Sequence, residues 1–269
     1  ADYFGRLVRL ATCRYEQQEY LQAQGILDDA KKLQPGIFGD SPHPFIARML
    51  QLQSEILRRQ GRFNEALEVI DQTIAMKKAI YGTEEHPSVA EALEVKVDLT
   101  LSQLHAQESS EILDTIERIR SKAYGKRHPE YANYQMRRAR WYEMAGQYDA
   151  ASEILEQSLQ TCLNAYSAEH PETIRRQIML ARMARMSNRI VGAETRINGV
   201  CETLGARLET EDSLIVAETF QELSNIRRVM GNYRASLAEL EKALRIETKI
   251  FGSESPKVIE LQNEKAKPL

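Results

Sequence analysis

The sequence predicts an all-α protein, a right-handed α-solenoid of about six helix-turn-helix repeats with a C-terminal capping helix. Three observations predict this fold. His-Pro recurs at residues 43, 86, 128 and 170, at intervals of 43, 42 and 42 residues. A small residue recurs once per period: Ala23, Ala66, Ser109, Ala151, Ala193 and Ser236. Apolar residues follow one another at intervals of three and four, as in Leu67, Ile70 and Ile74, which indicates helices and argues against strands.

The segment 81–93, "YGTEEHPSVAEAL", shows how each period begins. An aromatic residue and glycine end one helix, and His-Pro opens the next. Glycine accepts the left-handed conformation that ends a helix, and proline suits a first helical turn, where its missing N–H would have no partner. The histidine is therefore interpreted as architectural and not catalytic.

Each period divides into two helices at a short polar turn, such as "RRQGRFNEA". The small residues after these turns, and a second small register in the first helices, favour close helix–helix packing. That second register is Ala11, Ser54, Val97, Ala139, Ala181 and Ser224. The whole chain, 1–269, is expected to be a single solenoid whose core continues from repeat to repeat. The expected repeats are 1–39, 40–82, 83–125, 126–167, 168–209 and 210–252, with a capping helix at 256–267.

Composition excludes several classes of function. The 39 acidic and 36 basic residues nearly cancel, so no global charge draws the chain to nucleic acid or to an anionic membrane. No apolar run is long enough to span a bilayer, so no membrane insertion is expected. The three widely spaced cysteines suit a reducing, cytoplasmic compartment. No nucleotide-binding, zinc-protease or serine-hydrolase signature is present, so neither an enzyme nor a cofactor nor a small-molecule substrate is expected.

The turns "GRFNEA", "GQYDAA" and "GNYRAS" resemble the Gly-x-Tyr-x-x-Ala turn of the tetratricopeptide repeat. The 42-residue period with aromatic-Gly before His-Pro is similar, more narrowly, to the kinesin light chain and nephrocystin-3 type. That resemblance implies a protein-binding solenoid, whose first helices line a concave face. In that subfamily an asparagine seven residues after the proline contacts peptide backbones. The corresponding positions here are Gln51, Glu94, Met136, Ile178 and Gln221, so this mode of peptide binding is not carried over.

Two repeats depart from the pattern. Repeat three has "LHAQESS" in place of the glycine turn, and repeat five has Ser213-Leu214 where His-Pro belongs. The second departure predicts an altered angle between repeats five and six.

The first helices of repeats four and five supply the candidate partner-binding groove. Their inward stripes combine arginine with flexible apolar residues, which favours an acidic partner segment with an apolar anchor. The stripes contain Asn133, Met136, Arg137, Arg140 and Met144 in repeat four, and Arg175, Ile178, Met179, Arg182, Arg185 and Met186 in repeat five. The matching stripe of repeat three is acidic, with Glu91, Glu94 and Asp98, so the groove should be polarised.

Plainer interpretations remain open for these residues. The arginines could form a solvated face or pair with glutamates of adjacent helices. Trp141 is expected to pack in the core, and His105 has no partner at metal-ligand spacing, so no metal site is expected. RNA binding through the arginine-rich segment 174–185 is disfavoured, because its flanking helices are acidic and offer no aromatic platform.

The leading functional hypothesis is a non-enzymatic adaptor or scaffold that holds a partner peptide or helix in the groove. The alternatives are a structural arm in a large microtubule-associated or ciliary assembly, and a sensor arm of a larger multidomain protein. The absence of an initial methionine suggests an excised domain. These hypotheses fit a cytoplasmic location, and they are also compatible with an association with the cytoskeleton or a cilium.

Overall fold

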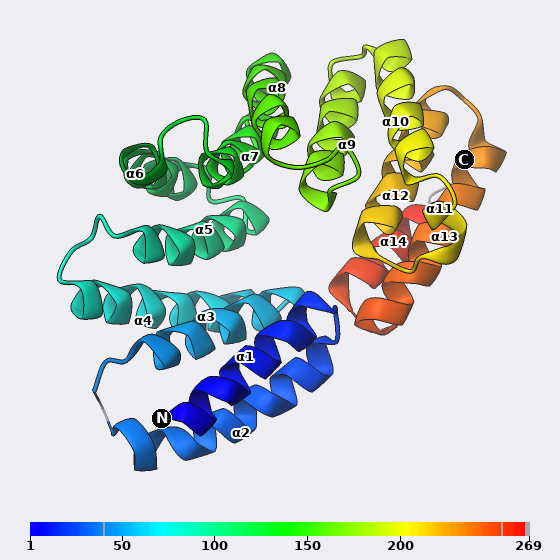
Figure 1. Cartoon of the computed structure of the whole chain (residues 1–269). Coiled ribbons are helices and arrows are strands. Elements are labelled where there is room, and N and C mark those ends of the chain that lie inside the picture. Colours follow the sequence, from blue (N-terminus) through cyan, green and yellow to red (C-terminus); the bar gives the residue numbers. More distant parts are fainter. Residues whose placement is uncertain (40, 254, 267–269) are drawn as a thin grey trace. The chain divides into compact units, whose positions relative to one another are not determined.

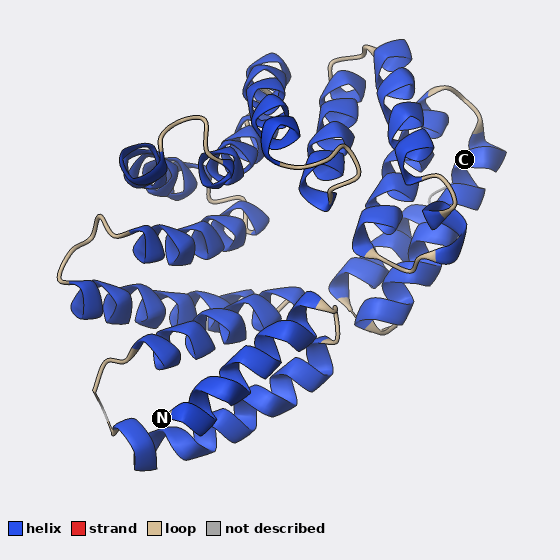
Figure 2. Cartoon of the chain, in the orientation of Figure 1, coloured by secondary structure: helices blue, strands red, loops and turns tan. Residues whose placement is uncertain are grey.

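The chain forms two compact units, Ala1–Ala123 and Tyr124–Leu269, in a computed structural model that describes residues 1–39, 41–253 and 255–266. All regular structure within those ranges is helical (Figure 1, Figure 2). Each unit consists of antiparallel helix pairs joined by short turns, which confirms the all-α class and the helix-turn-helix repeats. Continuity of all six repeats as one solenoid stays a prediction.

The first unit holds three helix pairs that coincide with the first three expected repeats. Their bounds are α1 (Asp2–Glu16), α2 (Tyr20–Phe38), α3 (Pro44–Arg59), α4 (Phe63–Tyr81), α5 (Pro87–Ser102) and α6 (Ala106–Tyr124), whose last residue lies at the unit boundary. The core runs through successive pairs, because Phe4, Leu27 and Ile56 belong to one buried cluster.

The second unit holds repeats four to six and the capping helix. Its helices are α7 (Pro129–Met144), α8 (Tyr148–Ala165), α9 (Pro171–Met186), α10 (Ile190–Leu204), α11 (Arg207–Thr210), α12 (Leu214–Val229), α13 (Tyr233–Phe251) and α14 (Pro256–Ala266). The expected capping helix at 256–267 is thus present as α14, and residue 267 lies outside the described residues. Glu247 of α13 is fully buried, and burial raises its pKa, an effect that Lys257 of α14 opposes with its Nζ 3.3 Å away.

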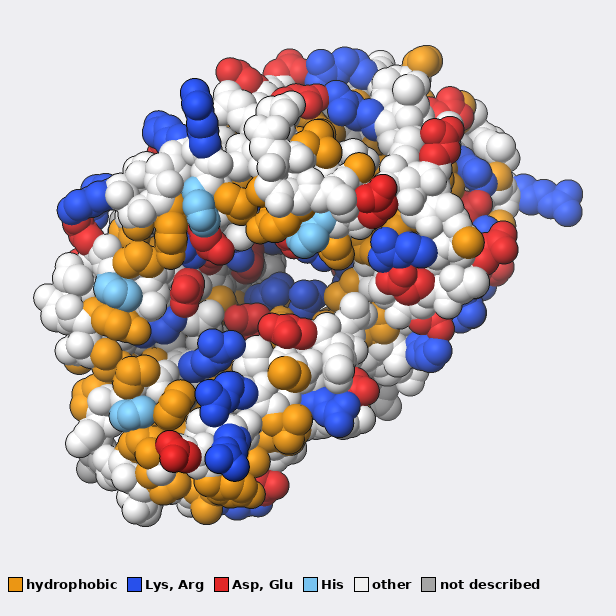
Figure 3. All heavy atoms as spheres, viewed as in Figure 1, with side chains coloured by type: hydrophobic (Ala, Val, Ile, Leu, Met, Phe, Trp, Pro, Cys, Tyr) orange, Lys and Arg blue, Asp and Glu red, His pale blue; other side chains and the backbone are white. Residues whose placement is uncertain are grey.

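The His-Pro histidines are helix N-caps. In α3, α5, α7 and α9 the imidazole Nδ1 accepts a hydrogen bond from the backbone N–H two residues further on, at 3.1–3.2 Å. The aromatic residue that ends the preceding helix lies against the same ring, and Tyr81 and His86 are stacked with centroids 3.6 Å apart. Hydrophobic side chains accordingly border the pale blue histidines in Figure 3. The repeated histidine is architectural, as predicted.

Replacing His86 by alanine should lower the free energy of unfolding by about 0.5–2 kcal/mol, because the first turn of α5 loses its cap. His86→Asn should cost less, since a carboxamide oxygen can also cap a helix. Urea unfolding measures both changes. Gln72→Ala is the control, because Gln72 is exposed within α4 and away from a helix N-terminus; a cost equal to that of His86→Ala would contradict the capping role.

The two small-residue registers lie where the helices of a pair cross. Every member of both registers is at most 6% exposed. Where the register holds serine, the hydroxyl can bond across the crossing: Ser54 Oγ donates to the Ala66 carbonyl at 2.8 Å, and Ser224 Oγ to that of Ser236 at 2.8 Å. Smallness at these positions therefore serves close helix packing.

The turn within each pair requires one residue in the left-handed region. Glycine provides it at residues 61, 146 and 231, whereas repeats one, three and five place Gln18, Leu104 and Asn188 there, Leu104 with φ +62°. Repeat three therefore makes the same turn as its neighbours without the glycine, at a cost in backbone strain of roughly 1–2 kcal/mol.

Replacing Leu104 by glycine should raise the free energy of unfolding by about 0.5–1 kcal/mol. The strain disappears and little packing is lost, because Leu104 is 74% exposed, although glycine gains entropy in the unfolded chain. Gly146→Ala, at φ +72°, should shift the urea midpoint in the opposite direction. An equal or lower midpoint for Leu104→Gly would show that the leucine is not strained.

Repeat five ends differently from the others, as its sequence indicates. α10 stops at Leu204, Gly205 adopts φ +50°, and the four-residue helix α11 precedes α12. Ser213 caps α12 without a side-chain hydrogen bond to the helix. The interruption is present, and the altered angle between repeats five and six stays a prediction.

Candidate functional site

The arginines of α9 differ in how much of the side chain reaches solvent. Arg175 and Arg182 are 36% and 37% exposed, Arg185 is 13% exposed and Arg176 is fully buried. Arg175 and Arg182 are seven residues apart, so they lie on the same face of α9, two turns from each other. This face is the part of the predicted stripe that keeps accessible charge.

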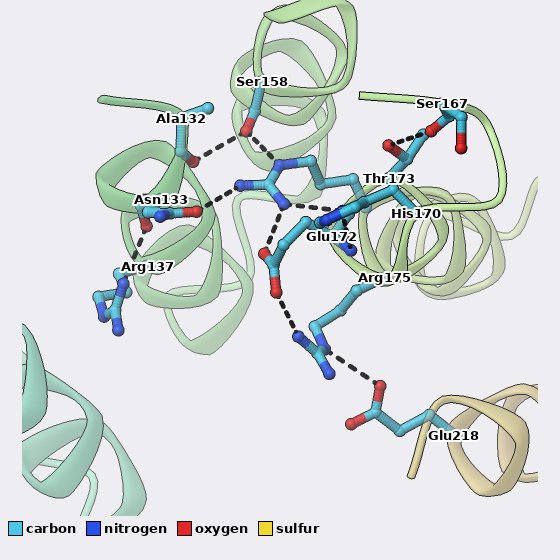
Figure 4. A network of polar contacts seen from close by, with 11 residues as sticks. Ala132, Asn133, Arg137, Ser158, Ser167, His170, Glu172, Thr173, Arg175 and Glu218 are labelled. Atoms are coloured by element: carbon cyan, nitrogen blue, oxygen red, sulfur yellow. Dashed lines mark hydrogen bonds and ion pairs between the residues drawn. The ribbon is translucent and has the colours of Figure 1, made fainter. Parts of the chain in front are cut away.

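One charge network joins α9 to the first helices of the repeats on either side (Figure 4). Arg175 donates to Glu172 at 2.7 Å and to Glu218 of α12 at 3.4 Å. Glu172 also accepts from Arg176 at 2.8 Å, and although burial opposes the effect, these two arginines lower the pKa of Glu172. The network therefore keeps Glu172 ionised and leaves Arg175 already paired.

The buried guanidinium of Arg176 anchors α9 to the preceding helix pair. It donates to Ser158 Oγ of α8 at 2.7 Å and to Asn133 Oδ1 of α7 at 3.0 Å. Arg137 donates to the backbone carbonyl of Asn133 at 3.2 Å, so Asn133 holds arginines of both helices. Asn133 is thus a packing residue as well as a member of the predicted stripe.

A second network lies two turns further along α9. Arg182 contacts Glu143 of α7 at 3.6 Å and Glu222 of α12 at 3.5 Å. Arg185 donates to both carboxylate oxygens of Glu222, at 2.7 and 3.2 Å. Glu222 is fully buried, so this carboxylate is part of the structure of the unit.

The apolar residues of the predicted stripe divide into two groups. Met136, Ile178 and Met179 are at most 9% exposed and belong to core clusters of the unit, so the expectation that they offer exposed anchors to a partner is wrong. Only Met144, half-buried, and Met186, 42% exposed, keep accessible apolar surface. Accessible surface on the predicted stripe is therefore offered by Arg140 and Met144 of α7 and by Arg175, Arg182 and Met186 of α9.

The positions of the missing asparagines explain this burial. Three of them pack with a residue of the second helix of the same pair, the one that stands eleven residues after the small register. Lys77 Nζ donates to Gln51 at 2.6 Å, Arg120 Nε donates to Glu94 at 2.9 Å, and Ile178 shares a core cluster with Leu204. These side chains are used in packing their own repeat, which leaves no row of amides for a peptide backbone.

The acidic stripe of repeat three is also engaged within its own unit. Glu94 is 6% exposed and pairs with Arg120, and Glu91 lies 3.4 Å from Lys77. Burial lowers the pKa of Lys77, which Glu91 partly offsets. Glu94 and Glu91 are therefore counterions of the buried Arg120 and Lys77.

Trp141 and His105, two further residues considered in the sequence, lie beside side chains of their own repeats. Trp141 is half-buried, with Tyr142 5.2 Å away edge-on and the Arg138 guanidinium 5.5 Å from its ring. His105 is exposed, with Nδ1 3.8 Å from Glu108. Within the described part of the chain no group of His, Cys, Asp or Glu residues could hold a metal ion, and no helix is long and apolar enough to cross a membrane.

Five further members of the two networks are not among the residues predicted from the sequence: Glu143, Glu172, Arg176, Glu218 and Glu222. A signal for them existed: residues about one period apart lie beside each other on neighbouring repeats. Arg175 and Glu218 are 43 residues apart, as are Asn133 and Arg176. Opposite charges at that separation predict a pair between repeats.

The paired helices and their constant period define the chain as an α-helical repeat protein. Residues 54–88 and 99–164 match two family models, both described as tetratricopeptide repeat. These two stretches are thus similar to tetratricopeptide repeats, which generally serve as non-catalytic protein or peptide interaction modules. No curated protein is matched by its sequence.

Solved structures of several helical repeat proteins have a similar fold. A putative kinesin light chain with nearly identical TPR-like repeats from Podosopora anserina is 24% identical, covers 77% of this chain and 97% of its own, and has a TM-score of 0.57. BtubC (BKLC) from P. vanneervenii is 11% identical over 93% of this chain and 92% of its own, with a TM-score of 0.58. NprR, solved with its cognate peptide NprX, is 13% identical over 98% of this chain and 73% of its own, with a TM-score of 0.75. At these identities the likeness shows the fold alone.

Proposed function

We propose that the chain is a non-enzymatic adaptor that binds an acidic segment of a partner protein on the first-helix face of α7 and α9. The observation that carries this proposal is the pair Arg175 and Arg182, which keep 36% and 37% of their side chains exposed on one face. Arg140 occupies on α7 the position of Arg182 one repeat earlier and is half-buried. The peptide complex of NprR, a protein of the same fold, supports a peptide as the partner.

The arginines of this face are already paired with glutamates, so carboxylates of the partner would have to replace these resident carboxylates. Glu172 and Glu218 already neutralise Arg175, and Glu143 and Glu222 neutralise Arg182. An acidic partner must therefore displace the more exposed carboxylates, of which Glu218 at 29% exposure is the most accessible on α12. This exchange makes binding sensitive to the resident glutamates as well as to the arginines.

The free energies expected from ion pairs and apolar burial limit the affinity of such a site. Three exposed ion pairs supply about 0.6–3 kcal/mol, and burial of Met186 against an apolar anchor adds about 1.5–3 kcal/mol. Micromolar binding requires about 8 kcal/mol. Acidic residues alone are insufficient, so the partner must add an apolar anchor and further hydrogen bonds.

Fluorescence anisotropy with labelled short peptides tests the proposal. The probes are peptides with Asp and Glu around one leucine, and counterparts with Asn and Gln in their place. Arg175→Glu with Arg182→Glu should abolish the preference for the acidic peptides, and Glu218→Gln should strengthen binding because Arg175 loses a resident partner. The preference should also fade as salt is raised.

Arg196→Glu is the matched control, since Arg196 lies on α10, is 40% exposed and pairs with Glu156 of the neighbouring repeat. It reverses one arginine on a different face and should leave binding unchanged. Binding that ignores the double reversal on α9, or that Arg196→Glu weakens equally, would refute an acidic partner on this face.

A structural arm in a microtubule-associated or ciliary assembly is the second candidate function. It is favoured by the exposed face of α1, where Tyr3 is 64% and Leu10 is 46% exposed. Cross-linking in the native assembly would support it, and contacts confined to α7 and α9 would count against it. A cytoplasmic location accords with either candidate, since all three cysteines are free.

A further inference from the structure

Three accessible residues of the predicted stripe on α9 form one narrow line along the helix. Arg175 and Arg182 keep 36% and 37% of their side chains exposed, and Met186 is 42% exposed. They stand seven and four residues apart, so they lie within about 40° of one another around the helix axis and span about 17 Å along it. Ile178 and Met179, which stand between the arginines, are at most 9% exposed. We call Arg175, Arg182 and Met186 the α9 line.

The first helices of the neighbouring repeats lie on both sides of the α9 line. Arg182 contacts Glu143 of α7 at 3.6 Å and Glu222 of α12 at 3.5 Å. Figure 4 shows Arg175 extending from α9 toward Glu218 of α12. The accessible surface of α9 therefore runs parallel to the helix axis between α7 and α12. A partner segment that contacts the whole line must run in the same direction.

The surface between the two arginines does not suit an extended backbone. Ile178 and Met179 are apolar and belong to core clusters, so they cannot bond to amide and carbonyl groups of a partner. The distance from Arg175 to Arg182 along α9 equals about three residues of an extended strand, whose first and fourth side chains point to opposite faces. A helical partner satisfies its own backbone groups and has the same rise per residue as α9. Its side chains at matching intervals can therefore contact the whole α9 line.

We propose that the partner segment is an amphipathic helix that lies along α9. It carries two carboxylates seven residues apart and an apolar residue four residues beyond the second, and these intervals are the same whichever way the helix points. The carboxylates meet Arg175 and Arg182, and the apolar side chain covers Met186, whose Sδ accepts a hydrogen bond from Arg185 at 3.5 Å. The inference rests on the acidic partner of the proposed function and adds the conformation, direction and spacing of that partner.

Peptides of one composition and different spacing test the inference by fluorescence anisotropy. Each holds two glutamates and one leucine in an alanine- and glutamine-based sequence that favours a helix. The matched peptides have the glutamates seven residues apart and the leucine four beyond, in both orders along the chain. The short-spaced peptide has intervals of three and three, which suit a polyproline-type segment. The better matched peptide should bind about tenfold tighter, because only it also buries the leucine, and a central proline should remove this advantage.

Variants of the protein locate the bound peptide. Arg175→Glu and Arg182→Glu should each weaken the matched peptide by at least about threefold to fivefold. Met186→Ala should weaken it only when the peptide carries leucine and not alanine at the apolar position. Arg140→Glu on α7 should cost less than Arg175→Glu, and Arg196→Glu on α10 is the control and should change nothing.

The outcomes separate this inference from the proposed function. Equal or tighter binding of the short-spaced peptide would overturn the helical partner while the preference for acidic peptides stands. A loss with Arg140→Glu that exceeds the loss with Arg175→Glu would overturn alignment along α9, in favour of a segment that crosses from α7 to α9. If no acidic peptide of either spacing responds to reversal of Arg175 and Arg182, the proposed function fails and the helical partner fails with it.

Discussion

Replacing Arg120 by leucine is expected to destabilise the first unit by about 3–5 kcal/mol. Arg120 is 1% exposed and Glu94 is 6% exposed, so loss of the guanidinium removes the buried cation 2.9 Å from that carboxylate. Urea unfolding and amide exchange in α5 and α6 measure the loss. Arg118→Leu on the same helix is the control and should cost about 0–1 kcal/mol, since its side chain is 62% exposed.

The double variant Glu94→Ile with Arg120→Leu carries the sharper expectation. It installs the Ile178 and Leu204 pair of repeat five, and apolar replacement of both members of a buried ion pair is often neutral or stabilising. The double variant should therefore recover most of the stability that Arg120→Leu loses. If the losses of the two single changes simply add, the pairing across the helices is not the source of the effect.

Replacing Glu222 by leucine should destabilise the second unit by about 3–5 kcal/mol. The substitution removes a fully buried carboxylate that accepts two hydrogen bonds from Arg185, whose side chain is only 13% exposed. The readout is urea unfolding with exchange rates of α9 and α12 amides. Glu218→Leu is the matched control on the same helix, and at 29% exposure it should cost about 0–1 kcal/mol.

Variants of Glu218 and Glu222 therefore distinguish an effect on binding from an effect on stability. Glu218→Gln should leave the unit folded and alter only the affinity of an acidic partner, whereas Glu222→Leu should loosen α9 against α12. Equal destabilisation by the two leucine substitutions would show that burial of Glu222 does not decide its energetic role.

Much of the fold could be predicted because backbone constraints repeat in the sequence. Gly and Pro mark where helices end and begin, and the small registers mark where they cross. The turn of repeat three shows where prediction from glycine and proline fails. Leu104 takes the left-handed position without glycine, since the fold of the pair imposes the turn on whatever residue stands there.

The candidate site was harder to predict, because the position of a residue in the helical register does not determine whether its side chain is buried. Met136 of α7 and Ile178 and Met179 of α9 belong to the same predicted stripe as the arginines, yet their side chains enter the core. Met136 and Ile178 occupy the positions of Gln51 and Glu94, and the opposite helices carry Cys162 and Leu204 in the register of Lys77 and Arg120. Polar pairs in repeats two and three thus become apolar pairs in repeats four and five, a change visible only when both helices are compared.

The charge networks have the same origin. Period-separated residues such as Arg175 and Glu218 lie beside each other, so the arginine stripe carries its own counterions. Carboxylates of the neighbouring repeats therefore reduce the positive electrostatic field of the arginine-rich face.

Amide hydrogen exchange with a bound partner tests the central claim most directly, that the first-helix face of α7 and α9 is where this chain binds. The probe is the acidic, leucine-containing peptide that binds tightest in the anisotropy series, added at saturation to the whole chain. We predict slower exchange along α7 and α9 and the facing part of α12, and no such slowing in the variant Arg175→Glu with Arg182→Glu. Protection confined to α1 or to the second helices α8 and α10 would contradict the account.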